Sequence, residues 1–357
     1  MQHLKVRFGY DNDDLLFPVY LKSEEVKILE ASGLRKPNYI LPNGAGVGYG
    51  YFKMDSRSRS YLLENLPNIN DSYLRGVIWL NLWDEMLYGN IKPIDMINLC
   101  IRALKTENDI LNTQRILSQL NSTFWNFLSE NQRAAKANQL ESILKLHLNE
   151  ATTVTNRSMY FRSLRSITIT DNGYDWLKSI WMKNDSIKGL TLSERDYITI
   201  ASELALRGKK DSQQILDSQL NQISNPDRKS RFKFIMASLS NDLKVRDNFF
   251  ELIKKEENRE VEPWVQSAVA YLHHPLRSKD SEKYILPSLE LLEEIQRTGD
   301  IFFPARFINA TLSGHQSENA KNIVNQFLKD HPNYSPALKL KILQAADNLF
   351  RASIIKD

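Results

Sequence analysis

The chain has 357 residues, which is long for a single core and sufficient for two domains or one extended array. Hydrophobic residues make up 42% and charged residues 25%, a balance that is typical of a globular protein and excludes a disordered one. The formal net charge is +4, and its 47 basic and 43 acidic residues are interspersed without long blocks, which argues against nucleic acid as a partner. No run of about 18 apolar residues occurs, so no membrane span is predicted.

Residues 1–55 have the pattern of short strands. Hydrophobic side chains alternate with polar ones over residues 4–8, and residues 15–21, 26–31 and 39–52 continue the pattern. That makes about five strands, fewer than the roughly seven of a complete immunoglobulin-like sandwich. Because an isolated part of a sandwich leaves strand edges uncovered, we interpret this region as the end of an incomplete β-sandwich domain.

Residues 56–357 change to a helical period. No glycine lies between Gly89 and Gly173, and no proline lies between Pro93 and Pro226, so the long middle of the chain lacks helix breakers. Short loops join the predicted helices, which favours antiparallel pairs stacked one on the next. The predicted fold class is mainly α, a HEAT/armadillo-like helical solenoid preceded by a partial β-sandwich, although no strict repeat motif is visible. The predicted helices cover residues 70–88, 93–105, 108–128, 131–148, 191–207, 211–223, 227–239, 259–273, 281–297, 317–329 and 335–352.

The residues needed for zinc-peptidase chemistry are absent from the sequence. Two histidines at i and i+4, with a glutamate after the first, would place two zinc ligands and a general base on one helix face. None of the six histidines is followed by glutamate. The single cysteine, Cys100, lies in an apolar run and is predicted to be a buried thiol. We therefore expect no catalytic residue, metal ligand or cofactor in this chain.

The glycine-rich segment over residues 44–50 could indicate either a phosphate-binding turn or a strand. Its glycines recur with period 2, and Tyr49 occupies the position at which a dinucleotide-binding turn needs its third glycine. A strand whose glycine face lets a neighbouring element approach is the favoured interpretation.

Other polar and aromatic positions favour structural roles. Adjacent residues diverge by about 100° on a helix, so the histidines of segment 273–275 are predicted to cap or support a helix end rather than bind peptide or metal. Asp84 and Glu85 form a polar strip with Asn81 and are predicted to have intramolecular partners. Core anchoring is predicted for the tryptophans at positions 79, 83, 125, 176, 181 and 264.

Five segments carry a resemblance to a known family. Residues 39–52 (YILPNGAGVGYGYF) look like the strand signature that closes the sandwich domain of aminopeptidase N-type zinc metallopeptidases, and residues 74–84 (LRGVIWLNLWD) resemble the first long helix of their C-terminal domain. Residues 225–229 (NPDRK), 258–265 (NREVEPWV) and 288–304 (SLELLEEIQRTGDIFFP) are similar to bacterial members. Each is a packing or turn signature, so the specificity lies in the series, which covers nearly the whole chain in order.

The resemblance implies a parent enzyme of four domains: an N-terminal β domain, a thermolysin-like zinc domain, a small sandwich and a helical cap. This chain would supply the last two, the sandwich in part, and would be inactive alone. The implied cofactor is zinc in the parent, and the implied partners are the catalytic domain of the same polypeptide and a peptide substrate. In the family the helical domain closes over the active site and forms the wall of an internal chamber. No family zinc ligand, general base or transition-state tyrosine has a matching position here.

Three arginines are candidate peptide contacts. Arg277, Arg297 and Arg306 lie at predicted inter-helix corners, where a basic side chain on a concave face could hold a peptide carboxylate through a charge-assisted bond. The alternative for each is a solvated surface residue. The alternative for the whole chain is a stand-alone HEAT-like interaction scaffold, which an upstream zinc motif in the gene would exclude. A lyase or transferase built on a helical toroid would need an acid/base set that the sequence does not contain.

Overall fold

The structure, a computed structural model, describes residues 2–11 and 13–355 and is mainly α-helical, with a small antiparallel sheet near the N-terminus. Its contacts group the chain into two compact units. Unit 1 runs to Phe124 and includes Ile355, and unit 2 spans Trp125–Ile354. Among the described residues, no helix has both the length and the apolar character needed to cross a membrane.

The sheet of unit 1 has three strands in the order β2-β1-β3, all antiparallel. They are β1 (Gln2–Gly9), β2 (Asp14–Leu21) and β3 (Tyr39–Leu41), of which β2 is an edge strand. The strand predicted over residues 26–31 is wrong, because a short 3-10 turn, η1 (Leu29–Ala31), occupies this stretch and leaves Leu29 in solvent.

The glycine-rich segment 44–52 is a turn and not the predicted strand. The side chain of Asn43 holds it from inside, since its Oδ1 accepts from Gly48 N at 2.9 Å and its Nδ2 donates to Gly48 O at 3.2 Å. Gly46 and Gly50 have φ values of 64° and 143°, a backbone region that a strand does not use and that favours glycine. The predicted close approach is nevertheless confirmed, because a Cβ at Gly44 would lie 2.4 Å from Arg7 Cβ and one at Gly48 would lie 2.4 Å from Leu4 Cδ2, both of β1.

The helices of unit 1 follow the strands without interruption. The first α-helix begins at Ser56, where the sequence pattern changes period. Asp55 caps it, because its carboxylate accepts the backbone N–H of Ser58 at 3.0 Å. The bounds are α1 (Ser56–Asn65), η2 (Leu66–Asn68), α2 (Ser72–Leu87), α3 (Pro93–Leu104) and α4 (Ile110–Asn126), whose last two residues belong to unit 2.

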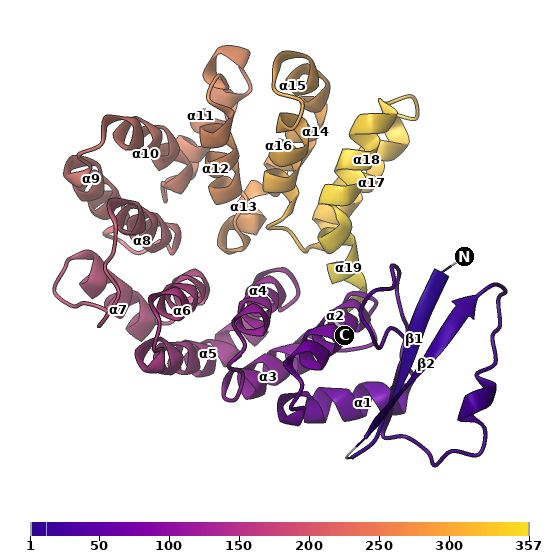
Figure 1. Cartoon of the computed structure of the whole chain (residues 1–357). Helices are drawn as coiled ribbons and strands as arrows, with labels where there is room; N and C mark the ends of the chain where they lie inside the picture. The colour runs from indigo at the N-terminus through magenta and orange to yellow at the C-terminus, as the bar shows by residue number, and fades with distance from the viewer. Residues whose placement is uncertain (1, 12, 356–357) are drawn as a thin grey trace. The chain divides into compact units, whose positions relative to one another are not determined.

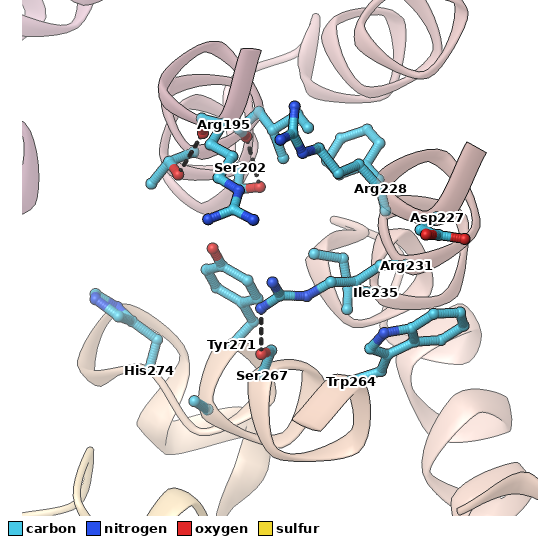
Figure 2. A pocket seen from close by; sticks show the side chains of 14 residues that line it. Arg195, Ser202, Asp227, Arg228, Arg231, Ile235, Trp264, Ser267, Tyr271 and His274 are labelled. Carbon is cyan, nitrogen blue, oxygen red and sulfur yellow. Dashed lines mark hydrogen bonds between the residues drawn. The ribbon is translucent and has the colours of Figure 1, made fainter. Parts of the chain in front are cut away.

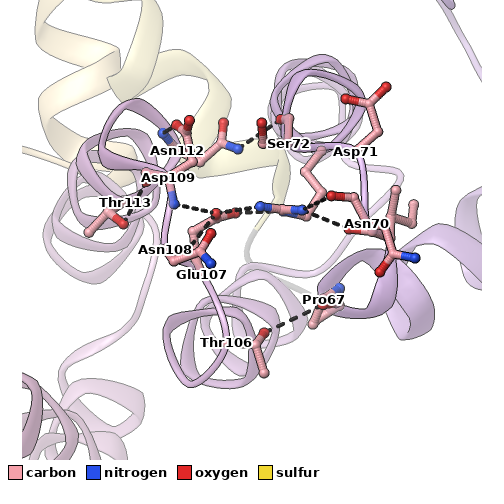
Figure 3. A network of polar contacts seen from close by, with 12 residues as sticks. Pro67, Asn70, Asp71, Ser72, Thr106, Glu107, Asn108, Asp109, Asn112 and Thr113 are labelled. Atoms are coloured by element: carbon pink, nitrogen blue, oxygen red, sulfur yellow. Dashed lines mark hydrogen bonds and ion pairs between the residues drawn. The ribbon is translucent and has the colours of Figure 1, made fainter.

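Arg75 of α2 ties three segments of unit 1 together. Its guanidinium forms a bidentate ion pair with the carboxylate of Glu107, with Nη2 2.6 Å from Oε1 and Nε 2.8 Å from Oε2. Its Nη1 donates to the carbonyl oxygens of Ile69 and Asn70. Glu107 also accepts from the backbone ahead of α4, as the polar network of Figure 3 shows. Both side chains are largely buried, so the pair is weakly screened by solvent.

Glu85 has the intramolecular partners that its sequence position predicted. The carboxylate is fully buried on α2 and accepts from Tyr51 Oη at 3.1 Å, from Met54 N at 2.9 Å and from Arg59 Nη1 at 3.0 Å. A buried charge needs such partners to offset its lost hydration. The bonds attach the glycine-rich turn and α1 to the first long helix.

Unit 2 is entirely helical, and its helices follow one another in chain order (Figure 1). One row of helices packs in series, α6 on α8, α8 on α10, α10 on α12, α12 on α16 and α16 on α18. The bounds are α5 (Glu130–Glu150), α6 (Val154–Ile167), α7 (Asp171–Trp181), α8 (Glu194–Leu206), α9 (Ser212–Gln222), α10 (Pro226–Leu239), α11 (Leu243–Ile253), η3 (Glu256–Asn258), α12 (Glu262–Leu272), η4 (Pro275–Arg277), α13 (Ser278–Ser281), η5 (Glu282–Tyr284), α14 (Ile285–Glu290), α15 (Leu292–Thr298), α16 (Phe303–Leu312), α17 (Glu318–Asp330), α18 (Pro336–Ala345) and α19 (Asp347–Ile355).

Side-chain bonds link each helix pair of unit 2 to the next at a nearly constant sequence distance. Arg246 Nη2 lies 2.9 Å from Asp280 Oδ2, 34 residues further along the chain. Arg259 Nη2 lies 2.5 Å from Glu294 Oε1 at a separation of 35 residues. Arg246 and Arg259 also donate to carbonyls at the end of a preceding helix, at Ser240 and Ile253. The helix pairs are therefore linked at regular intervals in the structure, although the sequence contains no strict repeat motif.

Candidate functional site

A cavity of about 590 Å³ opens on three neighbouring helices of unit 2, α8, α10 and α12. Its lining residues recur at three- to four-residue intervals, which places them on one face of each helix. Figure 2 shows the side chains of these helices around the cavity. Its polar and aromatic lining residues include Arg195, Arg228, Arg231, Trp264, Tyr271 and His274.

The lining positions follow a spacing of 36 residues from one helix to the next. Arg195, Arg231 and Ser267 occupy one such series, and Thr199, Ile235 and Tyr271 occupy another. Corresponding positions on successive helices therefore lie side by side. The hydrogen bond from Arg231 Nη2 to Ser267 Oγ, 2.9 Å long, is a direct result of this register.

The three arginines of the cavity differ in how far their charge is compensated. Arg228 forms an ion pair with Glu194, with Nη1 2.9 Å from Oε1. Among the described residues, the side-chain partner of Arg231 is the neutral hydroxyl of Ser267. In the part of the chain that the structure describes, the Arg195 guanidinium has no ion pair or hydrogen bond. Arg195 and Arg231 thus leave positive charge and N–H donors exposed to the cavity.

Tyr271 places a hydroxyl between these two arginines (Figure 2). Burial, followed by the charge of Glu203, raises the pKa of Tyr271 to about 12, although Arg165 and Arg231 act in the opposite direction. The hydroxyl therefore keeps its proton at neutral pH and can donate a hydrogen bond. Together the two guanidinium groups and the hydroxyl form a set of donors suited to a negatively charged group.

His274 contributes one more donor at the edge of the cavity. Its Nδ1 accepts the backbone N–H of Leu276 at 3.2 Å, which leaves the proton of the neutral ring on Nε2. Burial lowers the pKa of His274 well below its usual value, and the charges of Arg207, Arg277 and Arg133 lower it further. The ring is therefore neutral at physiological pH. The predicted capping roles are confirmed, since His273 ends α12 and His274 caps η4.

The remaining wall is mixed, with the carboxylate of Asp227 and the hydroxyl groups of Thr199 and Ser202 beside an apolar and aromatic part. Trp264 and Ile235 line it beside Arg231, and Phe234 packs on Trp264 with ring centroids 5.9 Å apart. The cavity can thus receive an anionic group and an apolar side chain together. The described residues contain no cluster of three or more His, Cys, Asp or Glu side chains that could hold a metal ion.

The three arginines predicted from sequence lie elsewhere in unit 2. Arg277 is buried, and its Nη1 and Nη2 each lie 2.6 Å from the carbonyl oxygens of Ser238 and Leu239. Arg297 is exposed in the last turn of α15, and Arg306 is exposed on α16 with its guanidinium carbon 5.7 Å from the ring of Phe302. None of the three lines this cavity. Their peptide contacts remain untested predictions.

Sequence reasoning missed Arg195, Arg231 and Tyr271. The signal that could have found them is the interval of 36 residues. It separates Arg195 from Arg231, and it separates Tyr271 from Ile235 in the neighbouring series. It was not visible as a motif because only a few positions in each helix pair share a residue type. Helix-face position, rather than proximity to a loop, is what brings these side chains together.

Comparison with known proteins relates the chain to aminopeptidases at low identity. No protein-family model matches the sequence. A stretch of 178 residues is 20% identical to the aminopeptidase N of Streptomyces lividans, and it covers 50% of this chain and 21% of that protein. The chain thus matches about a fifth of the length of this relative. The likeness supports an aminopeptidase-related chain and is too weak to assign it to a family.

Proposed function

We propose that this chain is the non-catalytic C-terminal part of a zinc aminopeptidase that removes N-terminal residues from peptides. In this proposal a HEAT-like helical solenoid caps the active site and shapes a chamber for the peptide. The cofactor, zinc, belongs to the catalytic domain of the same polypeptide. The three-stranded sheet belongs to the sandwich domain that joins the catalytic domain to the helical solenoid. The support is the likeness to an aminopeptidase N and the mainly helical fold.

The observation that carries the binding role is the cavity on α8, α10 and α12. Arg195 and Arg231 offer charge that no carboxylate compensates in the described part of the chain, and Tyr271 offers a protonated hydroxyl. The C-terminal carboxylate of a peptide fits this donor set, and Trp264 with Ile235 can receive its last side chain. Binding energy collected there, away from the scissile bond, would orient the reacting end of the substrate.

The second candidate, a stand-alone interaction scaffold, draws support from the same row of helices, because stacked helix pairs commonly bind extended partners. A scaffold needs no enzyme on the same polypeptide. The genomic reading frame upstream of codon 1 separates the two proposals: a His-Glu-Xaa-Xaa-His motif there supports the peptidase, and its absence supports the scaffold.

The peptide site can be tested on the chain as it stands. An octapeptide that ends in phenylalanine is titrated with a free and with an amidated C-terminus, and binding is followed by calorimetry. We expect the free acid to bind more tightly, and Arg195→Ala and Arg231→Ala each to weaken it about ten- to a hundred-fold, because a hydrogen bond to a charged group contributes about 1.5–3 kcal/mol.

A matched control is Arg162→Ala, which removes the same charge from an exposed position of α6 outside the cavity. Its affinity for the octapeptide should equal that of the unmodified chain. Equal binding of the acid and the amide, or equal affinity of all three variants, would show that this cavity does not hold a peptide carboxylate.

A further inference from the structure

A second cavity, of about 420 Å³, lies at the loops that join helix pairs of unit 2. Its wall includes four cationic side chains, Arg207, Lys209, Arg246 and Arg277, and one carboxylate, Asp280. They come from segments far apart in sequence, the ends of α8 and of η4 and the first turn of α11. Cationic side chains therefore outnumber carboxylates in the wall of this cavity, which is built by three successive helix pairs.

The arginines of this cavity are rigidly placed. The side chains of Arg207 and Arg246 are each 5% exposed, and Arg277 is similarly buried. Arg207 is held by the carbonyl oxygens of Thr168 at 2.5 Å and Arg165 at 2.9 Å. Side chains fixed in this way need little further ordering to receive a ligand.

The charges are only partly compensated. Arg207 pairs with Glu203, Arg246 with Asp280 and Lys209 with Asp171. Arg277 has no carboxylate partner among the described residues and is held by two backbone carbonyls alone. Burial and the nearby charge of Arg246 lower its pKa to about 9, which agrees with an excess of positive charge at this point.

Hydrogen-bond donors remain for a ligand. An arginine side chain has five N–H donors and a lysine has three. The bonds that the structure gives use two donors on Arg277, two on Arg246 and one on Lys209, within the described residues. Several N–H groups in one basic cavity suit a tetrahedral dianion better than a single carboxylate.

We propose that this second cavity is a binding site for a phosphate group, held by Lys209, Arg246 and Arg277. The free phosphate ion and the phosphate of a small monoester share the required chemistry, and the size of the cavity leaves room for the organic part of a monoester. The site is separate from the peptide cavity and does not depend on the function proposed for it.

The test is a calorimetric titration of the whole chain with inorganic phosphate, and in a second arm with O-phosphoserine, against sodium chloride at equal ionic strength. We expect saturable binding of phosphate and none of chloride. Tighter binding of O-phosphoserine identifies a monoester site, and equal or weaker binding identifies the free ion as the ligand. The same titrations on the variants below need no catalytic activity, so their outcome is independent of the aminopeptidase proposal.

Two variants make the test specific. Lys209→Gln should weaken phosphate binding about tenfold, since it removes one charge-assisted bond. Its control, Lys210→Gln, removes the same charge from the adjacent exposed residue, which does not line the cavity, and should leave affinity unchanged. Asp280→Asn removes the one carboxylate of the wall and should tighten binding. No saturable phosphate binding by the unmodified chain, or equal affinities of the Lys209 and Lys210 variants, would overturn the proposal.

Discussion

His273 Nδ1 lies 2.8 Å from His315 Nε2, and both imidazole rings are buried. One ring must donate and the other accept, and burial lowers the pKa of both rings, so both are neutral at neutral pH. The outer nitrogens, His273 Nε2 and His315 Nδ1, are buried without a hydrogen-bond partner in the described part of the chain. A proton added to either ring would therefore place a charge in a site that offers little to stabilise it.

This pair should make unit 2 sensitive to acid. Burial lowers the pKa of His315 from 6.5 to about 4, against the opposing charge of Glu282, and burial together with His315 lowers that of His273 well below 6.5. Between pH 6.5 and 4 the unfolded chain then binds more protons than the folded one, so stability is present above pH 6.5 and falls as the pH decreases. One pKa unit corresponds to about 1.4 kcal/mol, so His315 alone should lower the free energy of unfolding by about 3 kcal/mol across this range.

The measurement is urea unfolding at pH 7.5, 6, 5 and 4 for the unmodified chain and for His315→Gln. The variant should lose part of the slope between pH 6.5 and 4. The exposed His331 provides the control, because His331→Gln should leave the slope intact. A variant as acid-sensitive as the unmodified chain would show that this histidine pair does not cause the pH dependence.

Arg277→Ala should destabilise the chain, whereas Arg297→Ala and Arg306→Ala should not. The first change leaves the carbonyls of Ser238 and Leu239 without their buried donors, at a cost of about 2–4 kcal/mol. The other two remove exposed side chains and should stay within about 0.5 kcal/mol. Thermal unfolding of the three variants measures the difference. If Arg277→Ala unfolds at the temperature of the unmodified chain, the buried bonds do not stabilise the fold.

In the proposed parent enzyme, Arg195→Ala should reduce the specificity constant for an octapeptide more than that for a dipeptide amide. The long peptide alone reaches the cavity, and losing a remote contact there should lower its turnover about ten- to a hundred-fold. Steady-state kinetics of the full-length enzyme with both substrates test this. The same comparison for Arg277, Arg297 and Arg306 tests the arginines predicted from sequence. Equal ratios for all variants would place every one of these residues outside the peptide path.

The chain alone should neither bind zinc tightly nor cleave aminoacyl substrates. The reason is that no histidine in the sequence is followed by the glutamate of a zinc-peptidase helix. Metal analysis of the purified chain, combined with an alanyl-chromophore assay, provides the measurement. Stoichiometric zinc with chelator-sensitive turnover would contradict this prediction. It would also contradict the proposal that the zinc site lies in another domain of the parent enzyme.

Amide hydrogen exchange should be faster in the sheet than in α2. The edge strand β2 exposes Leu16 and Tyr20, so little apolar burial holds it in place. In contrast, Trp79 and Ile78 of α2 are fully buried. Exchange followed by mass spectrometry resolves the two regions. Uniformly slow exchange across both would show that the three strands are as stable as the helical core.

Sequence pattern located most helices and all three strands of the sheet, and it also predicted strands over residues 26–31 and 44–52 that the structure does not have. The helix starting after Asn225 is confirmed, because the side chain of Asn225 accepts the backbone N–H of Arg228 at 3.0 Å and Pro226 fits the first turn. Five of the described helices lie outside every predicted range, namely α1, α6, α7, α11 and α16, and their short length or their Ser, Thr and Asn content weakens the helical signal. Packing against neighbouring helices, which no local window contains, stabilises these segments.

The candidate site was harder to predict than the fold. Arginine occurs at both buried and exposed positions of this chain, so residue type did not separate Arg277, which is buried, from Arg306, which is exposed. The difference depends on which carbonyls and carboxylates lie within reach. The strand predicted for the glycine-rich turn was wrong for a related reason. The hydrogen bond from Gly48 to Asn43 holds the turn, and the alternation of apolar and polar residues gives no sign of that bond.

The links from Arg246 to Asp280 and from Arg259 to Glu294 also determine how unit 2 should respond to mechanical force. The two links overlap in sequence, because Arg259 lies between Arg246 and Asp280, so both carry tension applied across this region. Rupture of one leaves the other to bridge nearly the same stretch, and only the loss of both frees about 35 residues, which extend by roughly 120 Å at about 3.3–3.6 Å per residue. A force–extension trace of unit 2 should therefore show one large step for this pair of links rather than two small ones.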